Sequence, residues 1–115
     1  MLRGEIRLVD FGQTLPSESA HQRPAVIVSN DGANSTAARL GRGVVTVAPI
    51  TSNVNRVYPF QVFVPAHESG LDRDSKVQAE QVRSVAVGRV GRALGSVPAP
   101  LMLRVDEALR LHLSL

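Results

Sequence analysis

The sequence contains no cysteine, no tryptophan and a single lysine, and only four of its 115 residues are aromatic. Without cysteine, structural disulfides and thiolate metal sites are excluded. The three histidines, His21, His67 and His112, do not have the spacing of a zinc site. We therefore expect neither a metal ion nor another cofactor.

A long hydrophobic run is also missing. The N-terminal segment carries charges at Arg3, Glu5, Arg7 and Asp10, which leave no apolar core for a signal peptide. No apolar stretch approaches the roughly 18 residues that a membrane-spanning helix needs. The absence of cysteine suits a reducing compartment. Together these features predict a cytoplasmic protein.

The residues that are present fit one domain over 1–115, because 43% of them are hydrophobic and a chain of this length can build a core. The net charge is +3, and 12 of the 13 basic residues are arginine. Guanidinium groups bind phosphate with two hydrogen bonds and stack on bases, which favours a phosphate-rich partner. A GC-rich genome produces the same bias, and a charge of +3 alone does not indicate RNA.

Short segments with alternating or β-branched residues predict a mainly β fold. In the first segment, Ile6 and Leu8 are expected on a buried face, with charged residues between them. Asn30-Asp31-Gly32 has the composition of a turn. The predicted strands are 3–10, 24–29, 43–50, 58–64, 76–85 and a last one near 90–94, separated by loops at 11–22, 51–57 and 65–75.

The C-terminal segment predicts a helix. Pro98 and Pro100 are tolerated in a first helical turn. From Leu101 onward, apolar residues recur at three- or four-residue spacing, and we expect this stripe to pack on a small, curled sheet. The stripe consists of Met102, Val105, Leu109 and Leu113.

Polar residues at strand ends are the candidates for a site, because rigid elements position such groups well. Arg23 directly precedes Pro24, and Thr51 and Ser52 follow the strand 43–50. A surface arginine and an ordinary turn also explain these positions. No glycine-rich phosphate loop or nucleophilic triad can be placed. Further polar candidates in the charged strand 76–85 are Glu80, Gln81 and Arg83.

These segments together resemble the MazF/PemK toxin family. The similarity begins with Arg3-Gly4-Glu5-Ile6 and Val9-Asp10-Phe11, and its signature is the run from Gln22-Arg23-Pro24 to Asn30-Asp31. Ser17-Glu18 lies a few residues before that run. The remaining similar segments, in family order, are 47–52, 58–60, 74–75, 80–84 and 105–109.

The resemblance implies an SH3-like barrel of curved antiparallel strands with a C-terminal helix. It implies a homodimer that forms an RNA groove, cuts single-stranded RNA at short motifs and arrests translation. It also implies a MazE-like antitoxin whose acidic tail occupies the groove, and DNA binding by the toxin–antitoxin complex. The cut is expected to need no metal, because the ribose 2′-OH attacks the adjacent phosphate to give 2′,3′-cyclic phosphate and 5′-OH ends.

The resemblance makes Arg23 and Thr51 the catalytic residues, with Ser52 as a helper. Arg23 would stabilise charge on the phosphate, since a guanidinium holds its protons too tightly to be a good acid near neutral pH. Glu18 is a candidate base, beside Ser17 in the same loop. His21 replaces a glycine of many relatives and is a candidate proton carrier.

The remaining candidate residues could either contact RNA or have a purely structural role. Glu80 and Gln81 are expected to contact bases and Arg83 a phosphate, whereas Glu80 and Arg83 could equally form a cross-strand ion pair. With so few aromatics, base stacking is limited to Phe11, Tyr58 and Phe60, any of which could instead be core. Two alternative functions also stay open. One is a non-catalytic inhibitor of DNA gyrase like the related CcdB toxins, and the other is a module that binds RNA without cutting it.

Overall fold

The computed structural model describes residues 1–12 and 22–115, so most of the predicted loop 11–22 lies outside the described residues. The described part contains seven strands, three α-helices and two short 3-10 turns. These are β1 (Glu5–Asp10), β2 (Gln22–Ile27), α1 (Asp31–Leu40), β3 (Val44–Thr51), β4 (Gln61–Val64), α2 (Ala66–Ser69), β5 (Ser75–Gln78), η1 (Ala79–Gln81), β6 (Arg83–Ala86), η2 (Val87–Arg89), β7 (Val90–Ser96) and α3 (Ala99–Leu113).

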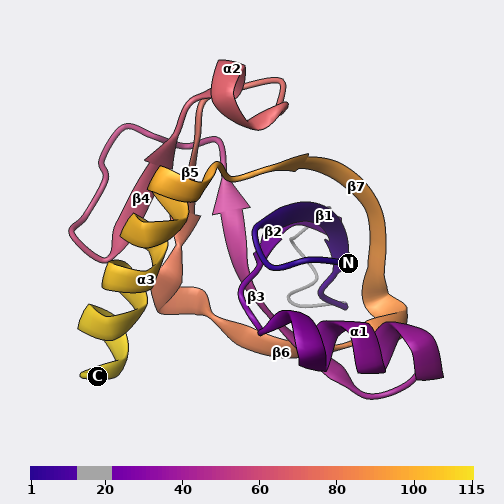
Figure 1. Ribbon diagram of the computed structural model, residues 1–115. Coiled ribbons are helices and arrows are strands. Elements are labelled where there is room, and N and C mark those ends of the chain that lie inside the picture. Colours follow the sequence, from indigo (N-terminus) through magenta and orange to yellow (C-terminus); the bar gives the residue numbers. More distant parts are fainter. Residues whose placement is uncertain (13–21) are drawn as a thin grey trace.

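The strands form one strongly curved antiparallel sheet in the order β4-β5-β3-β2-β1-β7 (Figure 1). β3 is the central strand, because one of its edges pairs with β2 and the other pairs first with β6 and then with β5. Among the described residues the path of pairings ends at β4 and at β7, so the sheet curls without closing. The predicted fold class, curved antiparallel strands with a C-terminal helix, is confirmed.

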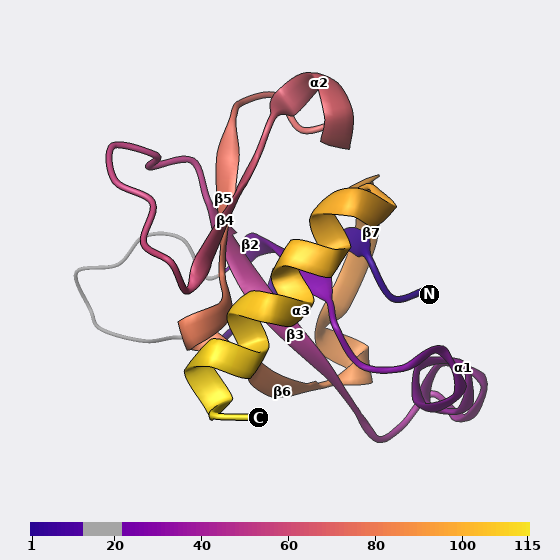
Figure 2. The same cartoon turned by 60° about the vertical axis from the view of Figure 1, so that its left-hand side comes forward.

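Helix α3 covers one face of this sheet and encloses the main core, packing on β4 and η1 (Figure 2). Met102, Val105 and Ala108 are buried there, and Leu109 packs against them. Leu113 stays 49% exposed, so the predicted apolar stripe ends one turn earlier than expected. None of the helices in residues 1–12 and 22–115 is long and apolar enough to cross a membrane.

The burial predicted for the first strand is wrong at its end. Ile6 and Val9 are fully buried, whereas Leu8 is only partly buried. Three positions separate Ile6 from Val9, so ordinary alternation puts them on opposite faces of β1, whose register with β2 is regular throughout. As a result Ile6 enters the core under α3, and Val9 enters a second core with Ala37 of α1.

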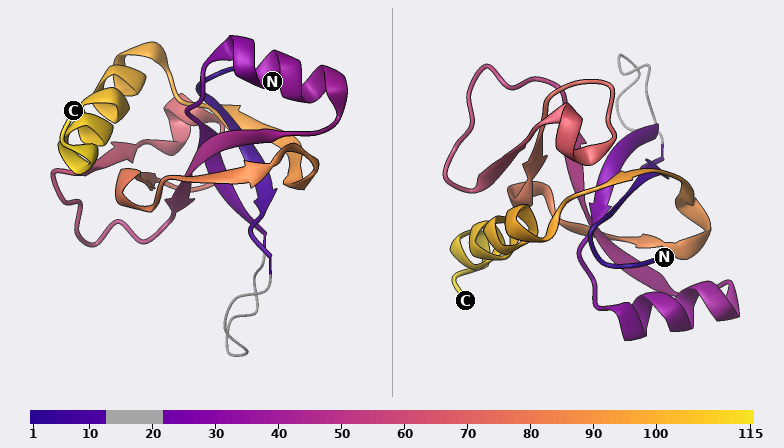
Figure 3. Two further views of the ribbon diagram at one scale, coloured as in Figure 1. Left: turned by 90° about the horizontal axis from the view of Figure 1, so that it is seen from below. Right: turned by 45° about the horizontal axis from the view of Figure 1, so that its top comes forward.

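Helix α1 was not predicted, because Asn30-Asp31-Gly32 resembles a turn. Instead Asn30 caps the helix: its Oδ1 accepts a hydrogen bond from the Ala33 N–H at 2.8 Å. The same short side chain favours turns and helix N-caps, so composition does not separate the two. The helix ends at Gly41, whose φ of 66° is left-handed. In both views of Figure 3, α1 and α3 lie well apart.

The predicted single strand 76–85 is also wrong, because η1 divides it into β5 and β6. This turn carries the chain from the end of β3, where Thr51 pairs with Lys76, to its beginning, where Val44 pairs with Ala86. Smaller differences are that β4 begins at Gln61 rather than at residue 58, and that the predicted loop 65–75 contains the short helix α2.

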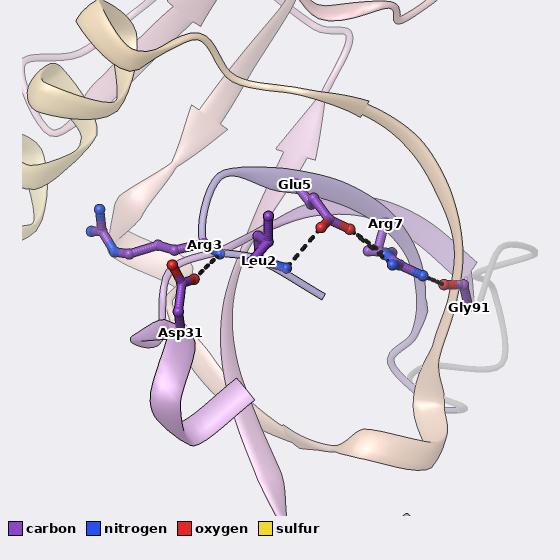
Figure 4. Close-up of polar contacts among 6 residues, drawn as sticks. All are labelled: Leu2, Arg3, Glu5, Arg7, Asp31 and Gly91. Atoms are coloured by element: carbon purple, nitrogen blue, oxygen red, sulfur yellow. Dashed lines mark hydrogen bonds and ion pairs between the residues drawn. The ribbon is translucent and has the colours of Figure 1, made fainter. Parts of the chain in front are cut away.

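Polar contacts hold the N-terminal strand against its neighbours (Figure 4). Glu5 accepts hydrogen bonds from the Leu2 N–H at 2.7 Å and from Arg7 Nε at 2.9 Å. Arg7 also donates to the Gly91 carbonyl of β7, and Asp31 accepts from the Arg3 N–H. Partial burial opposes the charge on Glu5, but its hydrogen bonds outweigh this and lower the pKa of Glu5 below its ordinary 4.5.

Candidate functional site

Strands β3, β4 and β5 separate apolar from polar side chains between their two faces. Val62, Val77 and Ile50 point into the core under α3. The alternate residues point to the opposite face, because side chains along a strand alternate and directly paired residues share a face. Thr51 pairs with Lys76 and Gln61 with Gln78. We call the face that carries Gln61, Lys76, Gln78, Thr51 and Arg23 the polar face.

Arg23, in β2, is held in place by β5 and β3. Its Nη2 donates a hydrogen bond to Gln78 Oε1 at 2.8 Å and lies 3.5 Å from the Ile50 carbonyl oxygen. Continuing the antiparallel register of β2 and β3, in which Ala25 pairs with Pro49, sets Arg23 opposite Thr51. The fold thus brings together the two residues expected to be catalytic. The guanidinium is half-buried, and its remaining N–H groups can reach a ligand.

Thr51 ends β3 with its hydroxyl beside the loop that follows. Its Oγ1 accepts a hydrogen bond from the Asn53 N–H at 3.2 Å. An oxygen that accepts in this way keeps its own proton for donation to a ligand. Ser52 is exposed next to it. A hydroxyl donor therefore stands at the strand end opposite the Arg23 guanidinium.

Thr51 and Ser52 also line a hollow of about 590 Å³ between the ends of β2 and β3, the segment after α2, and β7. Arg73 and Arg92 bring positive charge to its wall, and Asp72 brings one negative charge. The Arg23 side chain does not line this hollow, although its neighbour Pro24 does. Thr51 therefore lies where the hollow meets the polar face, an arrangement suited to an extended ligand rather than an enclosed one.

The structure separates Glu80 from Arg83. Glu80, in η1, accepts a hydrogen bond from Gln61 Nε2 at 2.8 Å, and its other carboxylate oxygen is buried with no partner in residues 1–12 and 22–115. Arg83 begins β6, and its guanidinium lies 5.2 Å from the centre of the Phe11 ring. The ion pair considered between Glu80 and Arg83 is not among those of the described residues. Gln81 is exposed between them.

Three candidates of the sequence analysis, Ser17, Glu18 and His21, lie outside the described residues. Their roles stay predictions. Among residues 1–12 and 22–115, no group of three or more acidic or histidine side chains is placed to hold a metal ion.

Sequence reasoning missed Gln78, Lys76 and Gln61. Lys76 is 8% exposed, and its Nζ donates to the Arg56 carbonyl oxygen at 2.6 Å. Gln61 is 7% exposed. The one compositional signal is that Lys76 is the single lysine beside 12 arginines. The glutamines carry no such signal, because their contacts depend on which strands become neighbours.

Comparison with known proteins gives the class to which this fold and site belong. The family described as the PemK-like, MazF-like toxin of type II toxin–antitoxin systems matches residues 2–113. The chain therefore belongs to this family, and the predicted membership is confirmed.

Individual relatives give the particular kind of toxin. Endoribonuclease MazF9 of Mycobacterium tuberculosis is 56% identical over 115 residues, which cover 100% of this chain and 98% of MazF9. Endoribonuclease MazF of Staphylococcus epidermidis is 32% identical over 98% of this chain and 91% of its own.

Solved structures agree with these relatives. A mycobacterial endoribonuclease in complex with its cognate antitoxin superposes with a TM-score of 0.76 at 25% identity, over 100% of this chain and 96% of that one. The Mycobacterium tuberculosis toxin MazF-mt6 superposes with a TM-score of 0.74 at 27% identity, over 96% of this chain and 97% of that one. The predicted class, an endoribonuclease toxin, is confirmed. The chemistry of its cut stays a prediction.

Proposed function

We propose that this chain cuts single-stranded RNA without a metal ion, and that the polar face around Arg23 and Thr51 is where the scissile phosphate binds. The observation that supports this most is the position of Arg23, whose guanidinium is fixed by Gln78 at 2.8 Å while it faces the end of β3. A fixed cation beside a hydroxyl donor suits the stabilisation of a phosphate that gains negative charge.

In the proposed reaction the nucleophile belongs to the RNA. The ribose 2′-oxygen attacks the adjacent phosphorus and loses its proton, and the bond from phosphorus to the 5′-oxygen of the next nucleotide breaks. The leaving oxygen takes up a proton, which yields a 2′,3′-cyclic phosphate and a 5′-OH end. The protein must hold the phosphate in line with the 2′-oxygen and stabilise the negative charge that develops.

Arg23 and Thr51 divide that task. The guanidinium can donate two parallel hydrogen bonds to phosphate oxygens, which both neutralises and orients the group. The Thr51 hydroxyl donates to a non-bridging oxygen. Ser52, exposed beside Thr51, supplements this donor. Neither Arg23 nor Thr51 is a good proton acceptor near neutral pH, so the base is a different group.

Glu18 and His21 are the proposed proton carriers, because Glu18 lies in the segment before Arg23 and His21 is two residues from it in sequence. A histidine titrates near pH 6.5 and suits proton transfer at neutral pH. Glu80 is better suited to positioning, since Gln61 and surrounding atoms cover its carboxylate. Gln81 and Arg83 are proposed to contact the RNA at the far side of η1.

The proposed partners follow from the same class. The mycobacterial relative solved with its cognate antitoxin supports an antitoxin for this chain, and the net charge of +3 suits an acidic one. We further propose a homodimer whose two polar faces line one RNA groove. Because the proposed substrate is mRNA, its place of action is the cytoplasm. A gyrase inhibitor would need neither Arg23 nor Thr51.

The experiment is cleavage of a defined single-stranded RNA in excess EDTA, followed by analysis of the new ends. We expect cleavage with 2′,3′-cyclic phosphate and 5′-OH ends. A matched RNA with one 2′-deoxynucleotide at the cut should stay intact there, because the nucleophile has been removed. RNA ending in 3′-OH, or cleavage of the 2′-deoxy control, would contradict the proposed mechanism.

A further inference from the structure

The loop that follows Thr51 carries an exposed stack of aromatic and cationic groups. The rings of Tyr58 and Phe60 lie 5.3 Å apart and only 3° from parallel. The Arg56 guanidinium lies 5.7 Å from the centre of the Tyr58 ring, and its Nη1 is 3.3 Å from the Tyr58 hydroxyl. Tyr58 remains 41% exposed. We call Arg56, Tyr58 and Phe60 the aromatic stack.

Buried polar groups hold this loop at two points. Lys76 donates to the Arg56 carbonyl oxygen at 2.6 Å. Gln61 accepts from the Tyr58 N–H at 3.2 Å, and its own backbone N–H donates to the Tyr58 carbonyl at 2.9 Å. Glu80 in turn accepts from the Gln61 amide. Burying polar groups is costly unless hydrogen bonds compensate it, and here the bonds of Lys76 and Gln61 to Arg56 and Tyr58 also fix the loop.

The anchors of the stack pair directly with residues of the proposed cleavage site. Lys76 pairs directly with Thr51, and Gln61 pairs directly with Gln78, which holds Arg23. Lys76 also lies with its Nζ 5.9 Å from the centre of the Tyr58 ring. The Lys76 side chain therefore runs from the strand position beside Thr51 to the aromatic stack.

We propose that Tyr58 and Arg56 form a subsite that stacks on the base of a nucleotide next to the cleaved phosphate. This inference rests on the proposed function. Phe60 supports one face of the Tyr58 ring, and the exposed ring and the planar guanidinium offer a surface for a base. Stacking tolerates every base, so the subsite sets the position of the RNA relative to Arg23. It does not read the sequence.

The first test compares Tyr58→Ala with Tyr58→Phe on a set of RNAs that each lack one base. On intact RNA, Tyr58→Ala should lower kcat/KM about ten- to a hundredfold, the usual effect of losing one stacked base, whereas Tyr58→Phe should keep most of the activity. On the RNA that lacks the stacked base, wild type and Tyr58→Ala should have equal kcat/KM. Leu103→Ala, which removes an exposed apolar side chain of α3, is the control and should be unaffected.

Equal losses for Tyr58→Ala on every abasic RNA, or no loss on intact RNA, would overturn the subsite. Melting temperatures of the variants detect any general loss of fold, and in that case Arg56→Ala on the same RNAs gives the answer. Arg56→Ala and wild type should have equal kcat/KM on the same RNA, the one that lacks the stacked base.

A binding measurement separates this inference from the proposed function. The probe is an uncleavable RNA with 2-aminopurine at the position found above, or at each position in turn if nothing is cut. Wild type should quench its fluorescence at one position and Tyr58→Ala should not. Quenching without cleavage would support the subsite and contradict the proposed chemistry. Cleavage without a difference in quenching between wild type and Tyr58→Ala would contradict the subsite and support the chemistry.

Discussion

The two faces of β3, β4 and β5 come from alternate residues of the same strands, yet they do different work. On the face under α3, Val62, Val77 and Ile50 are almost fully buried among other apolar side chains. On the polar face, Gln78 fixes Arg23 through one hydrogen bond of 2.8 Å. The apolar face shares its stabilising energy among many contacts, whereas the polar face depends on single donor–acceptor pairs.

This difference has a consequence for mutations. Removing a core side chain costs stability through lost burial and a cavity, and leaves the charges on the other face in place. Removing a partly exposed polar side chain such as Gln78 costs little stability, because water can replace it, whereas Gln61 and Lys76 on the same face are buried. Substitutions on the apolar face should therefore lower stability, and substitutions at partly exposed positions of the polar face should lower the cleavage rate.

The largest effect is expected for Arg23→Ala. It should lower the single-turnover cleavage rate about 10²- to 10³-fold, the typical loss when one group that stabilises transition-state charge is removed. The free energy of unfolding should change by about 1 kcal/mol, because the lost bonds are partly exposed. The matched control is Arg104→Ala, at an exposed arginine of α3, which should keep the rate. A loss of fold in Arg23→Ala would show that the two faces are not independent.

The smallest effect is expected at Glu5, outside both faces. Its pKa is lowered in the folded protein, so its charge stabilises the fold above the ordinary pKa of 4.5 and ceases to do so as the pH falls through the folded value. Glu5→Gln should therefore lower the melting temperature at pH 7 by an amount equivalent to about 1 kcal/mol or less. The difference from wild type should shrink in thermal unfolding as the pH falls below 4.5 and through the lowered pKa of Glu5. A constant difference at all pH values would exclude the charge as its cause.

The sequence predicted the apolar face better than the polar one. The period of Met102 and Val105 identified α3, and β-branched runs identified β2 and β3, because burial repeats with the geometry of each element. The prediction that Arg23 and Thr51 act together came from the family resemblance. Their relative position in space depends on the register of β2 with β3, which no local pattern records.

The failures have local causes. Asn30 caps a helix with the same side chain that would have made a turn, so α1 went unrecognised. The residues of β5, η1 and β6 alternate as if they were one strand, and only pairing with both ends of β3 divides them. Gln78 became a site residue because Arg23 lies beside it, a contact across 55 positions of the sequence.

The most direct test of the two-face account is a paired measurement on neighbouring residues of β5. Val77→Ala and Gln78→Ala are each assayed for melting temperature and for single-turnover cleavage of one RNA. We expect Val77→Ala to lose about 2 kcal/mol of stability and to keep the wild-type cleavage rate at temperatures below its unfolding transition. Gln78→Ala should keep its stability and cut about tenfold more slowly, since Arg23 loses one charge-assisted hydrogen bond. If rate and stability fall together in both variants, or if Gln78→Ala cuts like wild type, the polar face is not the site proposed here.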